Sequence, residues 1–322
     1  MANDFYSRSS PSREFELIQN AFDKLPPLTG NANEVVVVNS GATGLTSMSE
    51  IAFNAAIYGA LTGYIKGCIP SNNSGDATND IDFSAGFVFD GTRGYTVGAK
   101  TKRADANWAA GTGNGGRASG ASAWGAADWH LFVLLNPTTG ATDFGFDTSL
   151  TGANLITDAT SAGFTVTKRV GSLRTAGAAW PLLSAREIAI GLVKYLLKTP
   201  VFEFTKNWAG ADDTAQTGTL AAVPGGIQVN AILGVAFLDT TASAESGLLV
   251  TSLDQTDTAA VATVATTVAT VSISSNGGAP ARASCVIEIK TSTSRTFRYR
   301  GVGTTADHEV GFNAHGWEDS RI

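Results

Sequence analysis

The densest group of acidic side chains is Asp76, Asp80 and Asp82, within the polar segment 72–82. Several oxygen ligands on one loop are what Ca²⁺ prefers in proteins. The spacing, however, lacks the Gly and Glu that an EF-hand loop has at fixed positions. Asp and Asn side chains also build turns by accepting hydrogen bonds from nearby backbone amides. We therefore predict a polar turn that leads into a strand, with a calcium site as the alternative.

A glycine-rich segment at 111–116 (GTGNGG) matches the GxGxxG pattern of dinucleotide-binding loops. That pattern binds a dinucleotide only between a strand and a helix, with an acidic residue about 20 positions later. Here the segment Arg117-Ala118-Ser119-Gly120 follows, and it does not start a helix. We interpret the segment as a flexible hairpin tip.

The other reactive residue types are scattered. The three histidines are His130, His308 and His315, and no GxSxG nucleophile elbow accompanies them. A glycosidase needs a pair of carboxylates close in space, and the sequence singles none out. We therefore expect packed or hydrogen-bonded histidines, no enzymatic activity and no cofactor.

Three tryptophans, Trp108, Trp124 and Trp129, fall within a stretch rich in Gly, Asn and Ala. Such rings can stack on the apolar face of a sugar. More often they fill the core of a small β domain, because their large apolar area is worth burying. We predict core positions and keep sugar stacking as the alternative.

The first segment predicts a short helix. Ser10 can cap it, Pro11 suits its first position, and Pro26-Pro27 ends it. Its apolar residues recur at the spacing of a coiled-coil seam, namely Phe15, Ile18, Phe22 and Leu25. A helix this short is marginal alone in water, so we expect the stripe to pack against copies of itself or to dock on a partner.

A β-branched run follows at 34–38, ended by Asn39-Ser40-Gly41. It predicts a strand and a turn, and its continuous apolar character predicts that both faces are covered. We therefore add Val35 and Val37 to the helix stripe as candidate oligomerisation or attachment residues. The segment 1–60 is predicted to be the attachment and trimerisation segment.

The rest of the chain has short apolar runs bounded by Gly, Asn, Asp and Thr clusters, which is typical of β-sandwiches and barrels. Strands are expected at 86–89, 94–99, 129–135, 142–146 and 164–173, and at 227–238, 247–253, 268–274, 283–291, 295–302 and 308–315. Segment 185–198 fits a helix or a strand, and we favour a strand ending before Pro200. We predict a mainly β fold: a short N-terminal α-helix, then two antiparallel β-sandwich-like domains at 61–205 and 206–322.

The uncharged segment 258–270 is rich in Ala, Thr and Val, and an exposed strand of this kind would aggregate. We expect it to form a buried strand pair or part of a subunit interface.

Charge and cysteine content limit the function classes. The chain has 22 Lys and Arg against 28 Asp and Glu, a net charge of −6, and no basic stripe. Nucleic-acid binding needs clustered Lys and Arg, so we expect none. Two cysteines, Cys68 and Cys285, predict free, buried thiols, with a disulfide as the alternative. Neither a signal-peptide h-region nor an apolar run of membrane-span length is present, so we expect folding in a cytoplasm without membrane insertion.

Taken in order, several segments resemble bacteriophage tail-fibre and related virion proteins. Residues 15–28 (FELIQNAFDKLPPL) and 33–45 (NEVVVVNSGATGL) look like the virion-proximal start of such fibres. A recurrent phage module is similar to 69–86 (IPSNNSGDATNDIDFSAG), 102–116 (KRADANWAAGTGNGG), 129–134 (WHLFVL) and 168–173 (KRVGSL). The closing segments 290–295 (KTSTSR) and 316–321 (GWEDSR) also fit.

The resemblance implies a structural appendage of a virion, commonly a homotrimer anchored by its N-terminal part and made in the cytoplasm of a bacterial host. It implies tail, collar or portal-proximal virion proteins as partners and a tail-fibre, short-fibre or collar role. A head or neck decoration protein, and a receptor-binding protein that recognises a host surface glycan, are the alternatives. The module carries no catalytic residue onto this chain.

Overall fold

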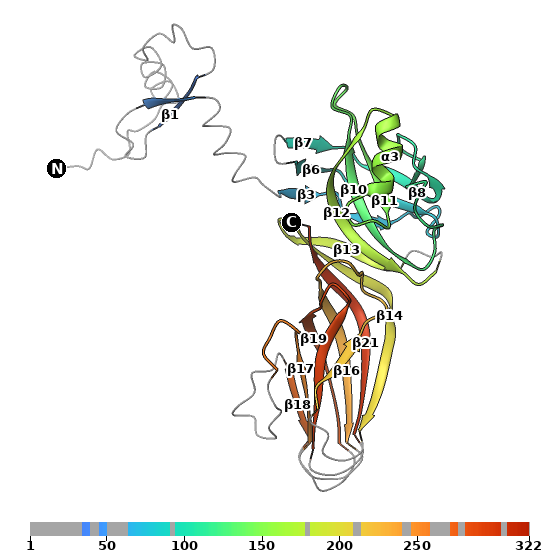
Figure 1. The fold of residues 1–322 in the computed structure, drawn as a ribbon, viewed down its shortest axis with the longest axis vertical. Helices are drawn as coiled ribbons and strands as arrows, with labels where there is room; N and C mark the ends of the chain where they lie inside the picture. Colours follow the sequence, from blue (N-terminus) through green and yellow to red (C-terminus); the bar gives the residue numbers. More distant parts are fainter. Residues whose placement is uncertain are drawn as a thin grey trace, which may run out of the picture. The chain divides into compact units, whose positions relative to one another are not determined.

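The computed structural model describes residues 34–38, 45–49, 64–90, 94–177, 181–208, 214–239, 246–257, 271–275, 281–303 and 308–321. The chain forms two compact units, Met1–Ala60 and Leu61–Ile322. Its described part is mainly β, as the sequence predicts, and consists of several curled sheets (Figure 1). The two sandwich-like domains are not confirmed. The predicted helix with Phe15, Ile18, Phe22 and Leu25, and the uncharged segment 258–270, lie outside the described residues.

In the first unit, β1 (Glu34–Val38) pairs antiparallel with β2 (Leu45–Ser49). The strand predicted at 34–38 is therefore confirmed. Val35 lies opposite Met48 and Val37 opposite Thr46 in the register. The side chains of Val35 and Val37 lie outside what the structure describes, so their role in attachment stays a prediction.

The second unit begins with two sheets. A three-stranded sheet has the order β3–β6–β7, with β3 Ile65–Gly67, β6 Gly86–Phe89 and β7 Gly94–Val97. A seven-stranded sheet has the order β12–β10–β11–β9–β8–β5–β4, with β4 Pro70–Asn72, β5 Asp80–Phe83, β8 Lys100–Asn107, β9 Gly115–Arg117, β10 Ala127–Leu135, β11 Thr142–Asp147 and β12 Thr165–Thr175. Its core contains Phe83 stacked on Phe144, with ring centroids 4.2 Å apart.

A helix that the sequence analysis missed, α3 (Ala153–Ser161), packs beside β11 and β12 (Figure 1). Its N-cap residue, Gly152, has no side chain to cap the first turn. The buried carboxylate of Asp147 caps it instead and accepts hydrogen bonds from the amides of Asn154 (2.8 Å) and Leu155 (2.9 Å). An anion at a helix N-terminus satisfies unpaired amides and opposes the helix dipole. Capping from a neighbouring strand leaves no local sequence signal.

Two further sheets follow. The five-stranded sheet has the order β13–β14–β21–β16–β19, with β13 Leu182–Ala189, β14 Leu192–Trp208, β16 Asn230–Asp239, β19 Ala281–Lys290 and β21 His308–Ser320. The four-stranded sheet has the order β15–β20–β17–β18, with β15 Gln216–Thr219, β17 Ser246–Thr251, β18 Val271–Ser275 and β20 Thr296–Gly303. The two sheets meet through aromatic rings: Phe312 of β21 lies 5.1 Å from Phe297 of β20.

Two expectations, about where a strand ends and where the first β domain ends, need correction. Segment 185–198 is strand and not helix, as favoured, but it is a hairpin of two strands, because β13 ends at Ala189 and β14 begins at Leu192. Strand β14 does not end before Pro200; the register shifts between Leu196 and Val201, which accommodates a residue without an N–H. Strand β14 also continues through residue 205, where the sequence analysis put a domain boundary. The chain passes from the seven-stranded to the five-stranded sheet at 176–181 instead. The number of domains stays a prediction.

Candidate functional site

The outer face of the five-stranded sheet carries an open trough of about 540 Å³. Three rungs of residues cross it, in the order β14, β21, β16 and β19. The first rung is Asn207, Glu309, Leu238 and Arg282; the second is Thr205, Gly311, Ala236 and Ser284; the third is Phe202, Asn313, Gly234 and Val286. Small side chains therefore form the middle of the floor.

Two exposed apolar side chains flank the third rung, and of the two only Phe202 lines the trough. Phe202 on β14 is 60% exposed and Val286 on β19 is 65% exposed. They occupy opposite ends of the same rung, with Asn313 and Gly234 between them. The imidazole of His315 covers Gly234, because a Cβ there would lie 2.6 Å from His315 Nε2. Glu309 and Arg282 carry opposite charges and lie in the first rung of the trough.

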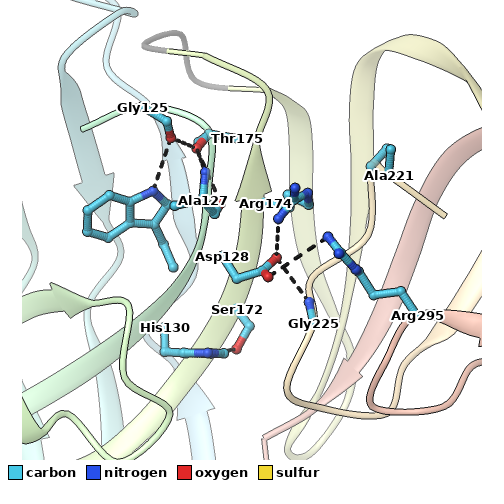
Figure 2. Close-up of polar contacts among 12 residues, drawn as sticks. Gly125, Ala127, Asp128, His130, Ser172, Arg174, Thr175, Ala221, Gly225 and Arg295 are labelled. Atoms are coloured by element: carbon cyan, nitrogen blue, oxygen red, sulfur yellow. Dashed lines mark hydrogen bonds and ion pairs between the residues drawn. The ribbon is translucent and has the colours of Figure 1, made fainter. Parts of the chain in front are cut away.

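A second group of polar residues joins the seven-stranded sheet to the five-stranded sheet and its loops. Asp128 of β10 lies between two guanidinium groups, 3.1 Å from Arg174 Nη1 and 3.9 Å from Arg295 Nη1 (Figure 2). Its Oδ1 also accepts the amide of Gly225 at 3.0 Å. One carboxylate of β10 thus holds β12, the loop at 220–228 and the turn before β20.

Beside it lies the one histidine with a strongly shifted pKa among the described residues. His130 is buried, and burial, together with the positive charge of Arg169, lowers its pKa to about 4. Its Nδ1 lies 2.7 Å from Ser172 Oγ (Figure 2). Arg169 Nη1 donates to that same oxygen at 2.9 Å, so the serine hydroxyl donates to a neutral imidazole. Ser172 is itself fully buried, so a substrate cannot reach its hydroxyl group.

The C-terminal residues of β21 extend this network. Arg169 forms a two-pronged ion pair with buried Asp319, and Arg321 Nη2 lies 2.7 Å from Glu187 Oε1 of β13. Arg321 also donates to the carbonyl of Gly67 in β3 at 2.6 Å. The final residues of the described chain therefore tie β21 to β12, β13 and β3.

Of the acidic residues singled out from the sequence, Asp76 forms a turn, as predicted, and Asp80 and Asp82 belong to β5, the strand into which the turn leads. Asp76 Oδ1 accepts the amides of Thr78 and Asn79, and the Asn79 hydrogen bonds hold the pKa of Asp76 below its usual range. Asp82 Oδ1 accepts Thr101 Oγ1 at 2.6 Å. Among the described residues, no three His, Cys, Asp or Glu side chains are grouped so that they could hold a metal ion.

The glycine-rich segment is not a hairpin tip, which corrects the sequence interpretation. Strands β8 and β9 on either side of it run parallel, so the loop crosses over instead of turning back. Buried Lys102 donates to the carbonyls of Ala109 and Gly111, and the Gly111 amide donates to Asp143 at 2.9 Å. A buried Lys102–Asp143 pair at 3.1 Å thus organises the loop.

The predicted core role is confirmed for two of the three tryptophans. Trp129 is fully buried and Trp108 is 8% exposed, so neither ring is available for stacking on a sugar. Trp124 is partly buried and packs on Trp129 with ring centroids 5.0 Å apart. Both cysteines are free; Cys68 is buried and Cys285 is only partly so. Burial raises the pKa of the Cys68 thiol to about 12.

No motif or periodic pattern in the sequence marks the residues of the trough, above all Phe202 and Gly311. The one local signal is Pro200 inside a strand-like run, because proline in a strand often marks a bulge. The stripe Phe15, Ile18, Phe22 and Leu25 lies outside the described residues, so the structure does not place it relative to the trough. No helix within the described ranges has the length and apolar character to cross a membrane.

No protein-family model and no curated protein matches the chain. Among solved structures, infectious bursal disease virus Gx strain aligns at 14% identity over 59% of this chain and 52% of that chain, with a TM-score of 0.13. A mutant VP2 protein of the same virus aligns at 12% identity over 60% and 50%, also with a TM-score of 0.13. The Gt strain aligns at 13% over 79% and 69%, with a TM-score of 0.14.

The chain spans about half the length of the first two of these viral chains, 52% and 50%. TM-scores of this size lie well below those of a shared fold. The alignments therefore support neither a fold family nor a function for this chain.

Proposed function

We propose that this protein is a structural component of a bacteriophage virion, a tail-fibre-like, short-fibre or collar subunit. In this proposal it attaches through its N-terminal segment, self-associates as a trimer and catalyses no reaction. The ordered resemblance of its sequence segments to virion appendage proteins motivates the class. Its partners are then sister copies and neighbouring proteins of the tail, collar or portal region.

One structural observation supports the non-catalytic part of this proposal above all others. Each buried acidic, basic or histidine side chain within the described ranges holds strands, loops or a helix together. These groups are Lys102 with Asp143, His130 with Ser172, Asp147 with the α3 amides, Glu318 with Lys194, Asp319 with Arg169, and Arg321 with Glu187. Enzymes instead keep perturbed ionisable groups where a substrate can reach them.

The His130–Ser172 pair is the arrangement closest to a catalytic one, and its geometry favours a structural role. A nucleophilic serine needs a base that takes its proton and an open path to the substrate. Here the histidine pKa is about 4 and the serine is buried beneath β-sheet. Its hydroxyl is also engaged by Arg169.

Native mass spectrometry of the full chain tests the assembly part of this proposal. A trimer is the expected species, and a monomer at micromolar concentration would count against self-association. Incubation with bacterial polysaccharides tests the non-enzymatic part. Release of reducing ends would overturn it, whereas unchanged polysaccharide supports it.

A further inference from the structure

We propose that the trough on the outer face of the five-stranded sheet binds a neutral oligosaccharide, with Phe202 as the ring on which a sugar stacks. The volume of about 540 Å³ lies within the ordinary range of ligand pockets. Three features of the trough carry the inference: the way Phe202 is exposed, the open space over Gly311, and the polar groups between the walls.

A β-bulge turns Phe202 outward. In a regular strand, residues two apart share a face, so Phe202 and Phe204 would both point into the core. The register with β21 pairs Phe202 with Asn313 and Phe204 with Phe312, which leaves Glu203 as the extra residue. Phe204 accordingly packs 4.9 Å from Phe312 inside, while Phe202 stays 60% exposed. Bulges often re-aim side chains beside functional sites.

Hydrogen bonds of the extra residue, Glu203, fix the bulge in place. The Glu203 carboxylate accepts the backbone amides of both Ala221 and Ala222. Two charge-assisted hydrogen bonds fix the extra residue and, through it, the outward direction of Phe202. The backbone that carries Phe202 is therefore held in place before any ligand arrives, which lowers the entropy cost of binding.

Gly311 leaves the middle of the trough open, and the packing of its neighbours does not require a glycine at this position. A Cβ at this position would meet only Thr205 Cγ2, at 3.7 Å, which is ordinary van der Waals distance. Glycine inside a strand costs about 0.5–1 kcal/mol relative to alanine. Neither crowding nor a left-handed backbone requires it here. Its effect is to keep the floor clear between the walls of β14 and β19.

The chemistry of the lining favours a saccharide over a polypeptide. A pyranose has an apolar face of C–H groups that suits the negative face of an aromatic ring, and hydroxyls around its edge. Hydroxyl and amide groups for that edge line the trough at Thr205, Ser284 and Asn313. Arg282 and Glu309 carry opposite charges, so the trough has no net charge that selects an anion.

Peptide strands and sister copies fit less well. The floor strands β21 and β16 are already paired on both sides, so a peptide strand laid along the floor finds no backbone partner. Strand β19 is the edge of the sheet, and strand addition there would lie beside the trough and not over its floor. A second copy would need a continuous apolar patch. Here the two exposed apolar side chains of the third rung, Phe202 and Val286, are separated by the polar Asn313 and by Gly234.

This inference deepens the proposed function by naming a ligand class for the subunit, and it is tested independently. Labelling of particles tests virion location, whereas saccharide binding is measured on the purified chain. Saccharide binding can therefore fail while the chain is still found on the virion. Equally, saccharide binding can be observed while the chain is absent from the virion.

The test uses the full chain and an immobilised array of neutral hexasaccharides built from glucose, mannose, galactose or N-acetylglucosamine. The best probe is then titrated calorimetrically against the wild type and three variants. Phe202→Ala removes the stacking ring, and Gly311→Leu fills the floor. Ile190→Ala is the matched control, because Ile190 is also 60% exposed but lies at the β13–β14 turn, away from the trough.

We expect at least one hexasaccharide to bind the wild type. Phe202→Ala should weaken that binding about tenfold or more, as loss of an aromatic stacking platform does elsewhere. Gly311→Leu should abolish it, and Ile190→Ala should leave it unchanged. Circular dichroism and the melting temperature establish that each variant is folded.

Two results would overturn the inference. One is that no neutral hexasaccharide binds at millimolar concentration, or that binding survives in both trough variants. The other is that native mass spectrometry finds an oligomer that dissociates in Phe202→Ala and Gly311→Leu but not in Ile190→Ala. That second result would assign the trough to a sister copy.

Discussion

Arg169 and Asp319 are 150 residues apart in the sequence and form a two-pronged ion pair. Arg169 Nη1 and Nη2 lie 2.6 Å and 3.1 Å from the two carboxylate oxygens. Asp319 is almost completely buried on β21, and Arg169 on β12 is 15% exposed. The pair thus connects the seven-stranded sheet with the five-stranded sheet, and Ser172 continues the contact to His130.

Asp319→Ala should destabilise the second unit strongly. It removes one partner of a buried pair and leaves Arg169 without its carboxylate, a change that typically costs about 3–5 kcal/mol. Chemical denaturation followed by tryptophan fluorescence measures the loss. The matched control is Asp105→Ala, which breaks the solvent-exposed Arg103–Asp105 pair and should change the midpoint much less. Equal losses in the two variants would mean that the buried pair does not join the sheets.

The stability should depend on pH through His130. Its folded pKa of about 4 lies below the unfolded value of 6.5, so the unfolded state binds the proton first as the pH falls. Stability present above pH 6.5 is therefore lost between pH 6.5 and about 4, by roughly 3 kcal/mol. Urea midpoints measured across this window test the expectation.

His130→Asn is the control for that pH dependence. Asparagine offers Ser172 an acceptor near the position of Nδ1 but does not titrate, so the variant should lose most of the slope between pH 4 and 6.5. Burial raises the pKa of Asp319, which acts in the opposite direction in acid. The difference between wild type and variant isolates the histidine. An identical slope in both proteins would show that His130 is not its source.

Two glycines should respond oppositely to the same substitution. Gly311→Ala should be neutral or stabilise the fold by up to about 1 kcal/mol, because its Cβ would meet only Thr205 Cγ2, at the ordinary contact distance of 3.7 Å. Gly116→Ala should destabilise by about 1–3 kcal/mol, because its Cβ would lie 2.4 Å from Phe146 Cζ. Thermal unfolding of both variants measures the contrast. Destabilisation by Gly311→Ala would mean that the floor of the trough is packed.

Phe22→Asp should weaken self-association, since it puts a charge into the predicted seam of Phe15, Ile18, Phe22 and Leu25. Sedimentation velocity of the full chain measures the oligomer, with Asp23→Asn as a control next to the stripe. Full oligomer in Phe22→Asp would exclude this helix as the seam.

Short-range pattern predicted much of the strand content. The runs at 86–89 and 142–146 coincide with β6 and nearly with β11, because alternating or β-branched residues between turn clusters report locally on strands. The core role of Trp129 and the turn formed by Asp76 followed from residue type alone. These features depend on neighbours a few positions away.

The features missing from the sequence predictions depend on partners that no periodic pattern marks. Helix α3 is capped by Asp147, which is eight positions before Leu155 and lies on the preceding strand. The loop between β8 and β9 is organised by buried Lys102 and Asp143, which are 41 positions apart. The outward direction of Phe202 requires the register with β21, more than 100 positions later. Pairings of this kind leave no periodic signal, so the trough was not predictable from one sequence.

The most direct test of the central claim is to locate this chain on phage particles. Antibodies raised against the purified chain and coupled to gold would be applied to particles produced from the genome that encodes it, and viewed by electron microscopy. The account predicts gold confined to a tail-fibre, short-fibre or collar position. Particles without gold, together with detection of the chain only in the soluble fraction of the lysate, would contradict a virion role.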